Sequence, residues 1–181
     1  RSVNEVLHDS KTDITIRTSL LDRRYIEGNI NLYKELETQF KVFQKKSIPD
    51  FIKSKLLEWE IRHLKMGGSR YMLEPNIKEG KGALRDLHTL FWIAKYAYGI
   101  NNFLEIKKIN INWKSELKRF IRAQNFLWSI RCHLHYLSKR NDNILNFEAQ
   151  NKIALFFGYK NRKNILAVER FMKKFYLTVR D

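Results

Sequence analysis

Apolar residues recur at intervals of three and four along most of the chain, a spacing that places them on one face of an α-helix. The pattern is clearest towards the C-terminal end, where it runs from Ile165 to Val179 in a heptad-like rhythm. No stretch shows a convincing alternation of apolar and polar residues, which would indicate a half-buried strand. The pattern therefore predicts an all-α fold. The positions expected to face inward include Leu32, Leu36, Phe40 and Phe43; Ile52, Leu56, Trp59 and His63; Leu87, Phe91 and Tyr98; and Val168, Met172 and Phe175.

Start and stop signals divide the apolar pattern into about six to eight helices. Ser2 and Glu5 form a capping box, Thr12 or Asp13 can cap a second helix, and Ser47 can cap a later one. We expect a single helical-bundle-like domain with one glycine-rich loop at residues 67–83. The longer helices are expected at residues 48–66, 84–98, 114–140, 147–157 and from about 163, and Gly28, Gly99 and Gly158 are expected to end helices.

The bulk composition narrows the class of protein. A length of 181 residues suits one well-buried domain. The single cysteine, Cys132, excludes an internal disulfide framework and is typical of a reducing cytoplasm. No apolar run reaches the length that a membrane span needs. We therefore expect a cytoplasmic protein without a membrane partner, and the first residue, an arginine, suggests a segment of a longer protein.

The formal net charge of +16 admits two interpretations. A basic balance of this size is typical of proteins that bind a polyanion, such as a nucleic acid or a nucleotide phosphate. The alternative is a generally basic surface without a specific partner, because the cations are spread along the chain. No known nucleic-acid-binding motif occurs at a usable spacing. The charge leaves a basic helical nucleic-acid-binding module as an alternative function. Because no such motif occurs, we expect no specific nucleic acid as a partner.

The stretch from Glu74 to Asp86 could bind an anion. Gly80 and Gly82 would let the backbone approach a ligand closely, and the loop leads directly into the first turn of a helix, whose free N–H groups and dipole favour phosphate. Arg85 opposes that dipole, so it asks for a compensating anion, either a structural carboxylate or a nucleotide phosphate. Lys78 and Lys81 add charge nearby, and Asp86 is suited to cap the helix or pair with a cation. An ordinary turn remains the other interpretation.

A second candidate lies within the long helix expected at residues 114–140. Gln124 and Arg131 interrupt its apolar stripe two turns apart, about 10 Å along the axis. A buried charge is costly unless it is paired. We therefore expect Arg131 to meet an Asp or Glu in a salt bridge or, alternatively, to contact a ligand.

Catalytic and metal-binding residues are not expected in this chain. His133 and His135 point in different directions on a helix, so a shared metal ion is not predicted. No Asp-x-Asp pair, which nucleotidyltransferases use to hold magnesium, occurs anywhere in the sequence. Cys132 has no adjacent base in the sequence, so it is expected to pack in the core rather than act as a nucleophile.

Five blocks follow one another in a recognisable order over nearly the whole chain. They are DITIRTSLLDRR (13–24) followed by Gly28, YMLEPNIK (71–78), GKGALRD (80–86) with TLFW (89–92), FLWSIRCHLH (126–135) with a partial match at 142–150, and AVERFM (167–172). Together these blocks resemble one family, the bacterial bifunctional PII uridylyltransferase/uridylyl-removing enzymes. Three substitutions depart from the family's pattern: Ala83 for glycine, Asn143 for arginine and Glu148 for aspartate. The first weakens the case for very close backbone approach at position 83.

The resemblance implies the central helical segment of an enzyme that transfers UMP from UTP to a tyrosine of the PII protein with Mg²⁺, removes it again, and responds to glutamine. Residues 1–28 would hold the end of the nucleotidyltransferase region and the first helices. Residues 29–181 would be the PII-uridylyltransferase-type helical domain, without the catalytic core, the HD domain or the ACT domains. The segment would form a helical wall beside the transferase site or, alternatively, a purely structural spacer. Candidate nucleotide-binding residues are Thr18, Asp22, Arg24, Lys78, Gly80, Gly82, Arg85, Asp86 and Arg131.

Overall fold

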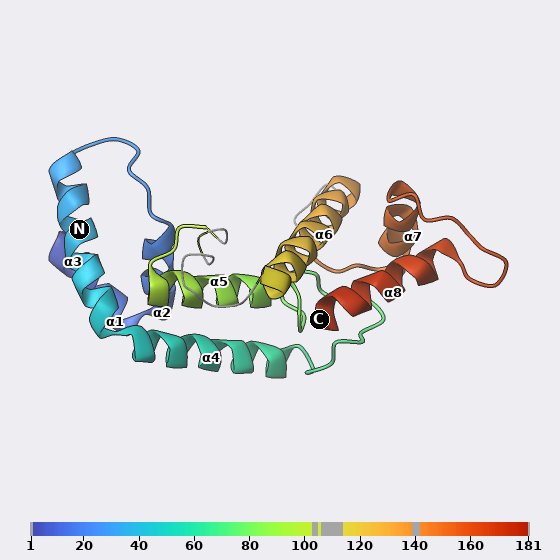
Figure 1. Cartoon of the computed structure of the whole chain (residues 1–181), viewed down its shortest axis with the longest axis horizontal. Helices are drawn as coiled ribbons and strands as arrows, with labels where there is room; N and C mark the ends of the chain where they lie inside the picture. The colour runs from blue at the N-terminus through green and yellow to red at the C-terminus, as the bar shows by residue number, and fades with distance from the viewer. Residues whose placement is uncertain (1, 103–104, 106–113, 139–141, 181) are drawn as a thin grey trace. The chain divides into compact units, whose positions relative to one another are not determined.

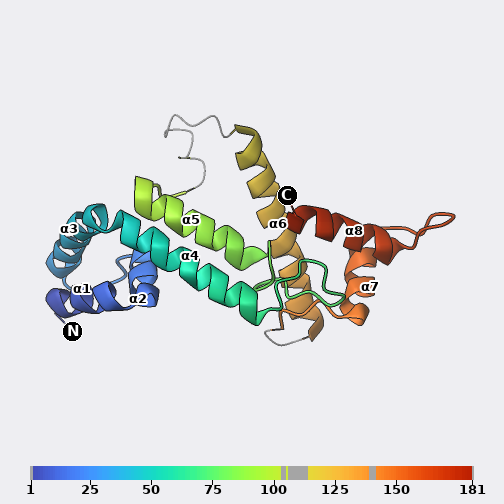
Figure 2. The same cartoon turned by 90° about the horizontal axis from the view of Figure 1, so that it is seen from below.

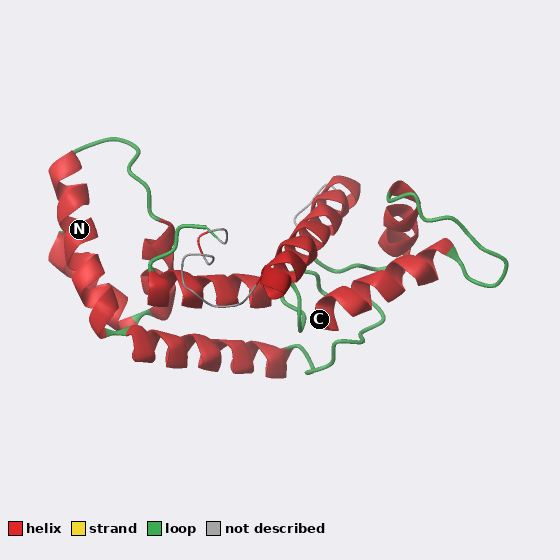
Figure 3. Ribbon diagram, in the orientation of Figure 1, coloured by secondary structure: helices red, strands yellow, loops and turns green. Residues whose placement is uncertain are grey.

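In the described part of the chain the fold is built from helices, with a long loop between Lys65 and Leu84. A computed structural model of the chain describes residues 2–102, 105, 114–138 and 142–180. Within these ranges no strand forms, and only two isolated β-bridges occur (Figures 1 and 3). The all-α prediction is confirmed. The helices are α1 (Val3–Thr12), α2 (Ile14–Ser19), the 3₁₀ turn η1 (Leu20–Asp22), α3 (Ile30–Lys46), α4 (Ile48–Lys65), α5 (Leu84–Tyr98), α6 (Lys114–Ser138), α7 (Phe147–Phe156) and α8 (Ala167–Arg180).

The chain forms two compact units, whereas the sequence predicted one. The first unit comprises Arg1–Trp59 and Thr89–Ile111, and the second comprises Glu60–His88 and Asn112–Asp181. Helices α4 and α5 each contribute residues to both units, so the apolar pattern continues across the division and gives no sign of it. In the described part of the chain, no helix is long and apolar enough to cross a membrane.

The first unit packs around aromatic rings. Phe40 and Phe51 are fully buried, and the ring of Phe51 stacks on that of Tyr96 at 3.8 Å between centroids. Burial raises the pKa of the Tyr96 hydroxyl, which lies 2.7 Å from the Ser47 hydroxyl. Helix α1 lies against α3 in both views (Figures 1 and 2). This aromatic centre joins α3, α4 and α5 within the unit.

The second unit has the larger apolar core, in which α7 packs on both α6 and α8 (Figure 2). Helix α8 contributes one continuous buried face, as its three-four rhythm predicted. The buried residues of this core include Ile77, Leu84, Leu127, Ile130, Leu134, Leu145, Ile153, Phe171, Met172, Phe175 and Val179.

Local signals at the first helices predicted the caps correctly. Ser2 and Glu5 form the expected capping box, with the Glu5 carboxylate accepting from the Ser2 N–H at 2.9 Å. Asp13 caps α2 and accepts from the Thr15 N–H at 2.6 Å. The backbone hydrogen bond from Thr15 is the largest of the effects that lower the pKa of Asp13. Ser47 behaves differently from the prediction: its hydroxyl donates back to the Phe43 carbonyl at 2.8 Å, at the end of α3.

Several side chains lie on the opposite side of their helix from the predicted one. Leu56 is 48% exposed, whereas the neighbouring Lys55 is buried. The Lys55 ammonium lies 4.6 Å from the centre of the Trp92 ring and pairs with Glu58, which compensates for its removal from water. Tyr98 is likewise exposed and Tyr96 buried. Cys132 is exposed rather than packed in the core.

The last helix begins four residues later than predicted. Residues 162–165 form a tight turn in which the Arg162 N–H donates to the Ile165 carbonyl at 2.9 Å. The Asn161 side chain accepts from the Ala167 N–H, and Glu169 accepts from the Leu166 N–H. Because these side chains satisfy the N–H groups at the start of α8, the helix cannot extend back to include Ile165, which is exposed.

Candidate functional site

The loop before α5 is held in place by backbone pairing within the second unit. The Ile77 N–H donates to the Asn143 carbonyl at 2.8 Å, and the Leu145 N–H donates to the Pro75 carbonyl at 2.9 Å. The pair forms an isolated antiparallel bridge. Buried Ile77 and Leu145 anchor the bridge in the core. The Leu-Glu-Pro-Asn stretch at residues 73–76 therefore helps to hold the loop against the segment at residues 143–145.

Side chains add further attachments to the same loop. The Glu74 carboxylate accepts from the Phe147 N–H at 3.0 Å, where a negative charge meets the positive end of α7. Gln150 donates to the Leu73 carbonyl at 2.7 Å, and the Tyr176 hydroxyl donates to the Met72 carbonyl at 2.8 Å. Both α7 and α8 thus hold the loop.

Gly80 and Gly82 allow contacts of the chain with itself. The Asn76 side chain accepts from the N–H groups of Lys78 and Glu79, forming a turn. A Cβ at Gly80 would lie 2.6 Å from the Asn76 carbonyl oxygen, and a Cβ at Gly82 would lie 1.9 Å from the Val179 carbonyl oxygen. The sequence analysis expected these two glycines to let a ligand approach the backbone closely. In the structure they let the protein's own backbone approach instead.

The first N–H groups of α5 already have partners. Leu84 donates to the Ile77 carbonyl at 3.1 Å, Arg85 donates to the Lys78 carbonyl at 2.8 Å, and Asp86 donates to the Ala83 carbonyl at 3.0 Å. The expectation of free N–H groups at this helix start is therefore wrong for residues 84–86. These three N–H groups are therefore not offered to an anion at the start of α5.

Asp86 is the centre of a half-buried polar network. Its carboxylate accepts from the Gly82 N–H at 2.7 Å and from Arg62 at 2.6 Å, and it lies 2.9 Å from the Nε2 of His63. Asp86 thus caps α5 and pairs with a cation, Arg62, as the sequence predicted. Arg62 and His63 were absent from the predicted site. His63 had been placed on the inward face of α4, but nothing in the sequence indicated its partner.

Arg85 pairs with a structural carboxylate, one of the two partners that the sequence analysis left open for it, although the sequence did not indicate which carboxylate. Its guanidinium donates to Glu79 at 3.2 Å, and the Lys78 ammonium lies 3.5 Å from the same carboxylate oxygen. Burial acts to raise the pKa of Glu79, but the hydrogen bond and charge of Arg85, together with Lys78, outweigh it and leave the pKa lowered. About a third of each of the three side chains stays exposed. The loop therefore presents two cations around one ionised carboxylate.

Arg131 has a neutral partner in place of the expected Asp or Glu. Its guanidinium donates to the Asn143 side chain at 2.9 Å and lies 5.2 Å from the centre of the Trp128 ring. The Arg131 side chain is half-buried, so its charge is stabilised both by solvent and by the face of the Trp128 ring. Asn143, one of the departures from the family pattern, thus contacts one of the candidate residues.

The remaining three candidates lie in the first unit. Thr18 is buried and its hydroxyl donates to the Ile14 carbonyl within its helix. Asp22 accepts from the Trp92 indole at 3.2 Å and from Lys95 at 2.7 Å, which joins η1 to α5. Arg24 is exposed. The structure thus places Lys78, Gly80, Gly82, Arg85 and Asp86 together at one loop, and Thr18, Asp22 and Arg24 in another unit.

The described residues do not supply a metal site. Among them, no group of three or more His, Cys, Asp or Glu side chains is arranged to hold a metal ion. The carboxylates nearest the loop, Glu79 and Asp86, are each paired with arginine. The donor set at the loop therefore fits an anion better than a magnesium ion.

Comparison with known proteins matches this loop and the helices around it to a protein family. The family model described as GlnD PII-uridylyltransferase matches residues 50–181, which include the loop, α5 and the whole core of α6, α7 and α8. The chain belongs to the GlnD PII-uridylyltransferase family. The motif resemblance seen in the sequence is thereby confirmed.

A relative in the family agrees over a longer range. The bifunctional uridylyltransferase/uridylyl-removing enzyme of Rhodospirillum rubrum is 47% identical over 178 residues, which is 98% of this chain and 19% of that protein. The chain thus spans about one fifth of the length of this GlnD relative. No solved structure matches the chain.

Proposed function

We propose that this chain is the central helical segment of a bifunctional enzyme that transfers UMP from UTP to the PII protein and removes it again. The printed name of the Rhodospirillum rubrum relative and the match of the family to residues 50–181 support the proposal. PII and UTP would be the partners, Mg²⁺ the metal and glutamine the effector. This chain matches 19% of the relative's length. The metal ligands and the reacting groups would belong to the part of the full-length enzyme outside this segment.

Within that enzyme, the segment would form a wall beside the nucleotide. The observation that carries this role is the arrangement of Arg85 and Lys78 around Glu79 on a loop fixed by α7 and α8. A rigid loop holds its cations at a constant position, so little ordering cost remains when an anion binds. A phosphate could take over the guanidinium of Arg85 in place of Glu79, with bidentate geometry.

The nine candidate residues would divide into two roles. Arg24, Lys78, Arg85 and Arg131 are cations with exposed or half-exposed side chains, suited to contact phosphate or the PII surface. The others would support the site: Thr18, Asp22, Gly80, Gly82 and Asp86 are engaged in contacts within their own unit.

The test uses the full-length protein with purified PII, Mg²⁺ and UTP labelled at the α-phosphorus. The proposal expects the full-length protein to place the label on PII. When the transfer of UMP is then stopped and its removal is allowed to proceed, the label should be lost from PII. The 181-residue chain alone should do neither, because its described residues hold no metal-ligand cluster. Transfer of UMP by the isolated chain, or failure of the full-length protein to label PII, would contradict the proposal.

A further inference from the structure

The carboxylate of Glu79 faces cations on two sides within the second unit. Its Oε1 accepts from the Arg85 guanidinium at 3.2 Å and lies 3.5 Å from the Lys78 ammonium. Its Oε2 lies 4.0 Å from the Nε of Arg62, which belongs to α4. The side chains of Arg85 and Lys78 are about one third exposed, whereas that of Arg62 is 14% exposed. Glu79 therefore lies between two accessible cations and one that is more deeply buried.

The guanidinium of Arg62 has one donor that is not used. Its Nη2 donates to the Asp86 carboxylate at 2.6 Å. Its Nε is shielded from solvent and makes no hydrogen bond within the described part of the chain. The separation of 4.0 Å from Glu79 exceeds the usual hydrogen-bond length of about 2.9 Å. Because a buried N–H without an acceptor is costly, a carboxylate that moved about 1 Å closer to this Nε would gain a bond there.

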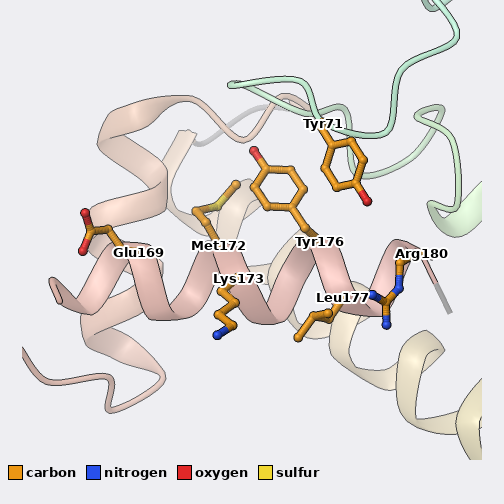
Figure 4. Close-up of a pocket in the computed structure, with 7 residues that line it drawn as sticks. All are labelled: Tyr71, Glu169, Met172, Lys173, Tyr176, Leu177 and Arg180. Atoms are coloured by element: carbon orange, nitrogen blue, oxygen red, sulfur yellow. The ribbon is translucent and has the colours of Figure 1, made fainter.

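The backbone that carries Glu79 is held in place, so its carboxylate can turn without a movement of the loop. The Asn76 side chain accepts from the N–H groups of Lys78 and Glu79. Before this turn, the ring of Tyr71 lies beside that of Tyr176 on α8, with ring centroids 5.7 Å apart (Figure 4). An exchange of partners at Glu79 therefore needs a change of side-chain rotamer and little further ordering of the chain.

Glu79, rather than Asp86, is the carboxylate that can change partners. Asp86 accepts from the Gly82 N–H at 2.7 Å and from Arg62 at 2.6 Å, and its side chain is 15% exposed. The three cations around Glu79 lie 3.2, 3.5 and 4.0 Å from it, and its side chain is 28% exposed. Longer contacts and greater exposure both make Glu79 the easier carboxylate to displace.

We propose that Arg62 is a positioning residue that receives Glu79 when a phosphate group binds to Arg85 and Lys78. Without phosphate, Glu79 occupies the anion site that these two cations form. Phosphate takes the two cations with stronger, bidentate bonds, and Glu79 turns to the Nε of Arg62. Neither the carboxylate nor the buried N–H is then left unpaired. The inference rests on the proposed role of the loop beside the nucleotide, and it adds a residue of another helix that sets how tightly the phosphate is held.

The test measures the affinity of the full-length protein for inorganic triphosphate, by isothermal titration calorimetry, in a double-mutant cycle. Glu79→Gln keeps the shape of the side chain and removes the charge that competes for Arg85. Arg62→Lys keeps a cation for Asp86 but lacks the Nε–H that faces Glu79. Glu148→Gln is the matched control, because it removes the same charge from the surface of α7. Circular dichroism checks that each variant is folded.

The inference expects Glu79→Gln to bind triphosphate about threefold or more tightly than wild type, because no carboxylate has to be displaced. Arg62→Lys alone should weaken binding by about threefold or more, and by less than about 1.5-fold in the Glu79→Gln background, where no carboxylate needs a new partner. Glu148→Gln should bind as wild type does. If Arg62→Lys does not fold, the affinity of Glu79→Gln decides.

Four results would overturn the inference. They are no binding of triphosphate, unchanged or weaker binding by Glu79→Gln, unchanged binding by Arg62→Lys, and an equal loss from Arg62→Lys in both backgrounds, which would indicate a purely structural role. The proposed function has a separate readout, the labelling of PII. Unlabelled PII contradicts that function, whereas labelled PII without coupling between residues 62 and 79 contradicts this inference alone.

Discussion

The Cα of Gly82 faces the carbonyl oxygen of Val179 so closely that a Cβ at position 82 would lie 1.9 Å from that oxygen. Gly82 also has a φ of 78°, in the left-handed region that side-chain-bearing residues rarely adopt. The contact joins the loop before α5 to the last turn of α8. This contact and the left-handed backbone are sufficient to explain why position 82 requires a glycine.

Replacing Gly82 by alanine should therefore destabilise the second unit. The left-handed backbone and the steric overlap with α8 each contribute, so we expect a loss of about 2–4 kcal/mol in the free energy of unfolding. Gly158→Ala is the matched control, because Gly158 has a φ of 75° but no atom within 4 Å of a built Cβ. It should cost only about 1 kcal/mol. Urea unfolding of both variants measures the difference, and equal losses would show that the contact with Val179 is unimportant.

The Asp86 carboxylate should contribute to stability through its partners. Asp86→Asn leaves Arg62 and His63 without their anion in a half-buried site, so we expect a loss of about 2–4 kcal/mol. Glu148→Gln removes a carboxylate that pairs with Lys152 on the surface and should have no measurable effect. Thermal unfolding followed by circular dichroism compares the two. Similar melting temperatures for the two variants would argue against the network.

Glu79 should make stability depend on pH in a defined direction. Its pKa in the folded protein is lowered from the ordinary value of 4.5, so the folded state binds the proton less tightly than the unfolded state does. The stabilisation is complete above about pH 4.5 and is lost as the pH falls through the lowered pKa. Wild type should thus melt above Glu79→Gln at pH 7, and the gap should close in acid. A gap that stays constant or widens in acid would contradict the assigned pairing with Arg85 and Lys78.

Local signals were sufficient to predict much of the fold. The capping box at Ser2 and the cap at Asp13 involve only neighbouring residues, so the sequence contains all of their determinants. The buried Lys55 depends on Trp92, far along the chain, and periodicity alone favoured its neighbour Leu56 for the interior. The start of α8 was misplaced because the Ala167 and Leu166 N–H groups donate to the side chains of Asn161 and Glu169, which overrides the apolar rhythm.

The loop that carries several of the candidate residues lies between α4 and α5, where the sequence predicted a loop, but its internal bonds were not foreseen. Its two glycines were predicted to approach a ligand, whereas they approach the carbonyls of Asn76 and Val179. The pairing of Arg85 with Glu79 depends on how the loop turns back on itself. Propensity and spacing do not determine which of several nearby carboxylates a guanidinium will meet.

The central claim is that Arg85 faces the nucleotide in the full-length enzyme, and steady-state UMP transfer to PII by an Arg85→Ala variant tests it most directly. Loss of a charged hydrogen bond, worth about 1.5–3 kcal/mol, should lower kcat/KM by about 10- to 150-fold. The melting temperature and the removal of UMP from modified PII should be unchanged, and Arg122→Ala, an exposed arginine on α6, should transfer UMP at the wild-type rate. If Arg85→Ala unfolds the protein or abolishes transfer and removal together, Arg85 belongs to the scaffold and the claim is contradicted.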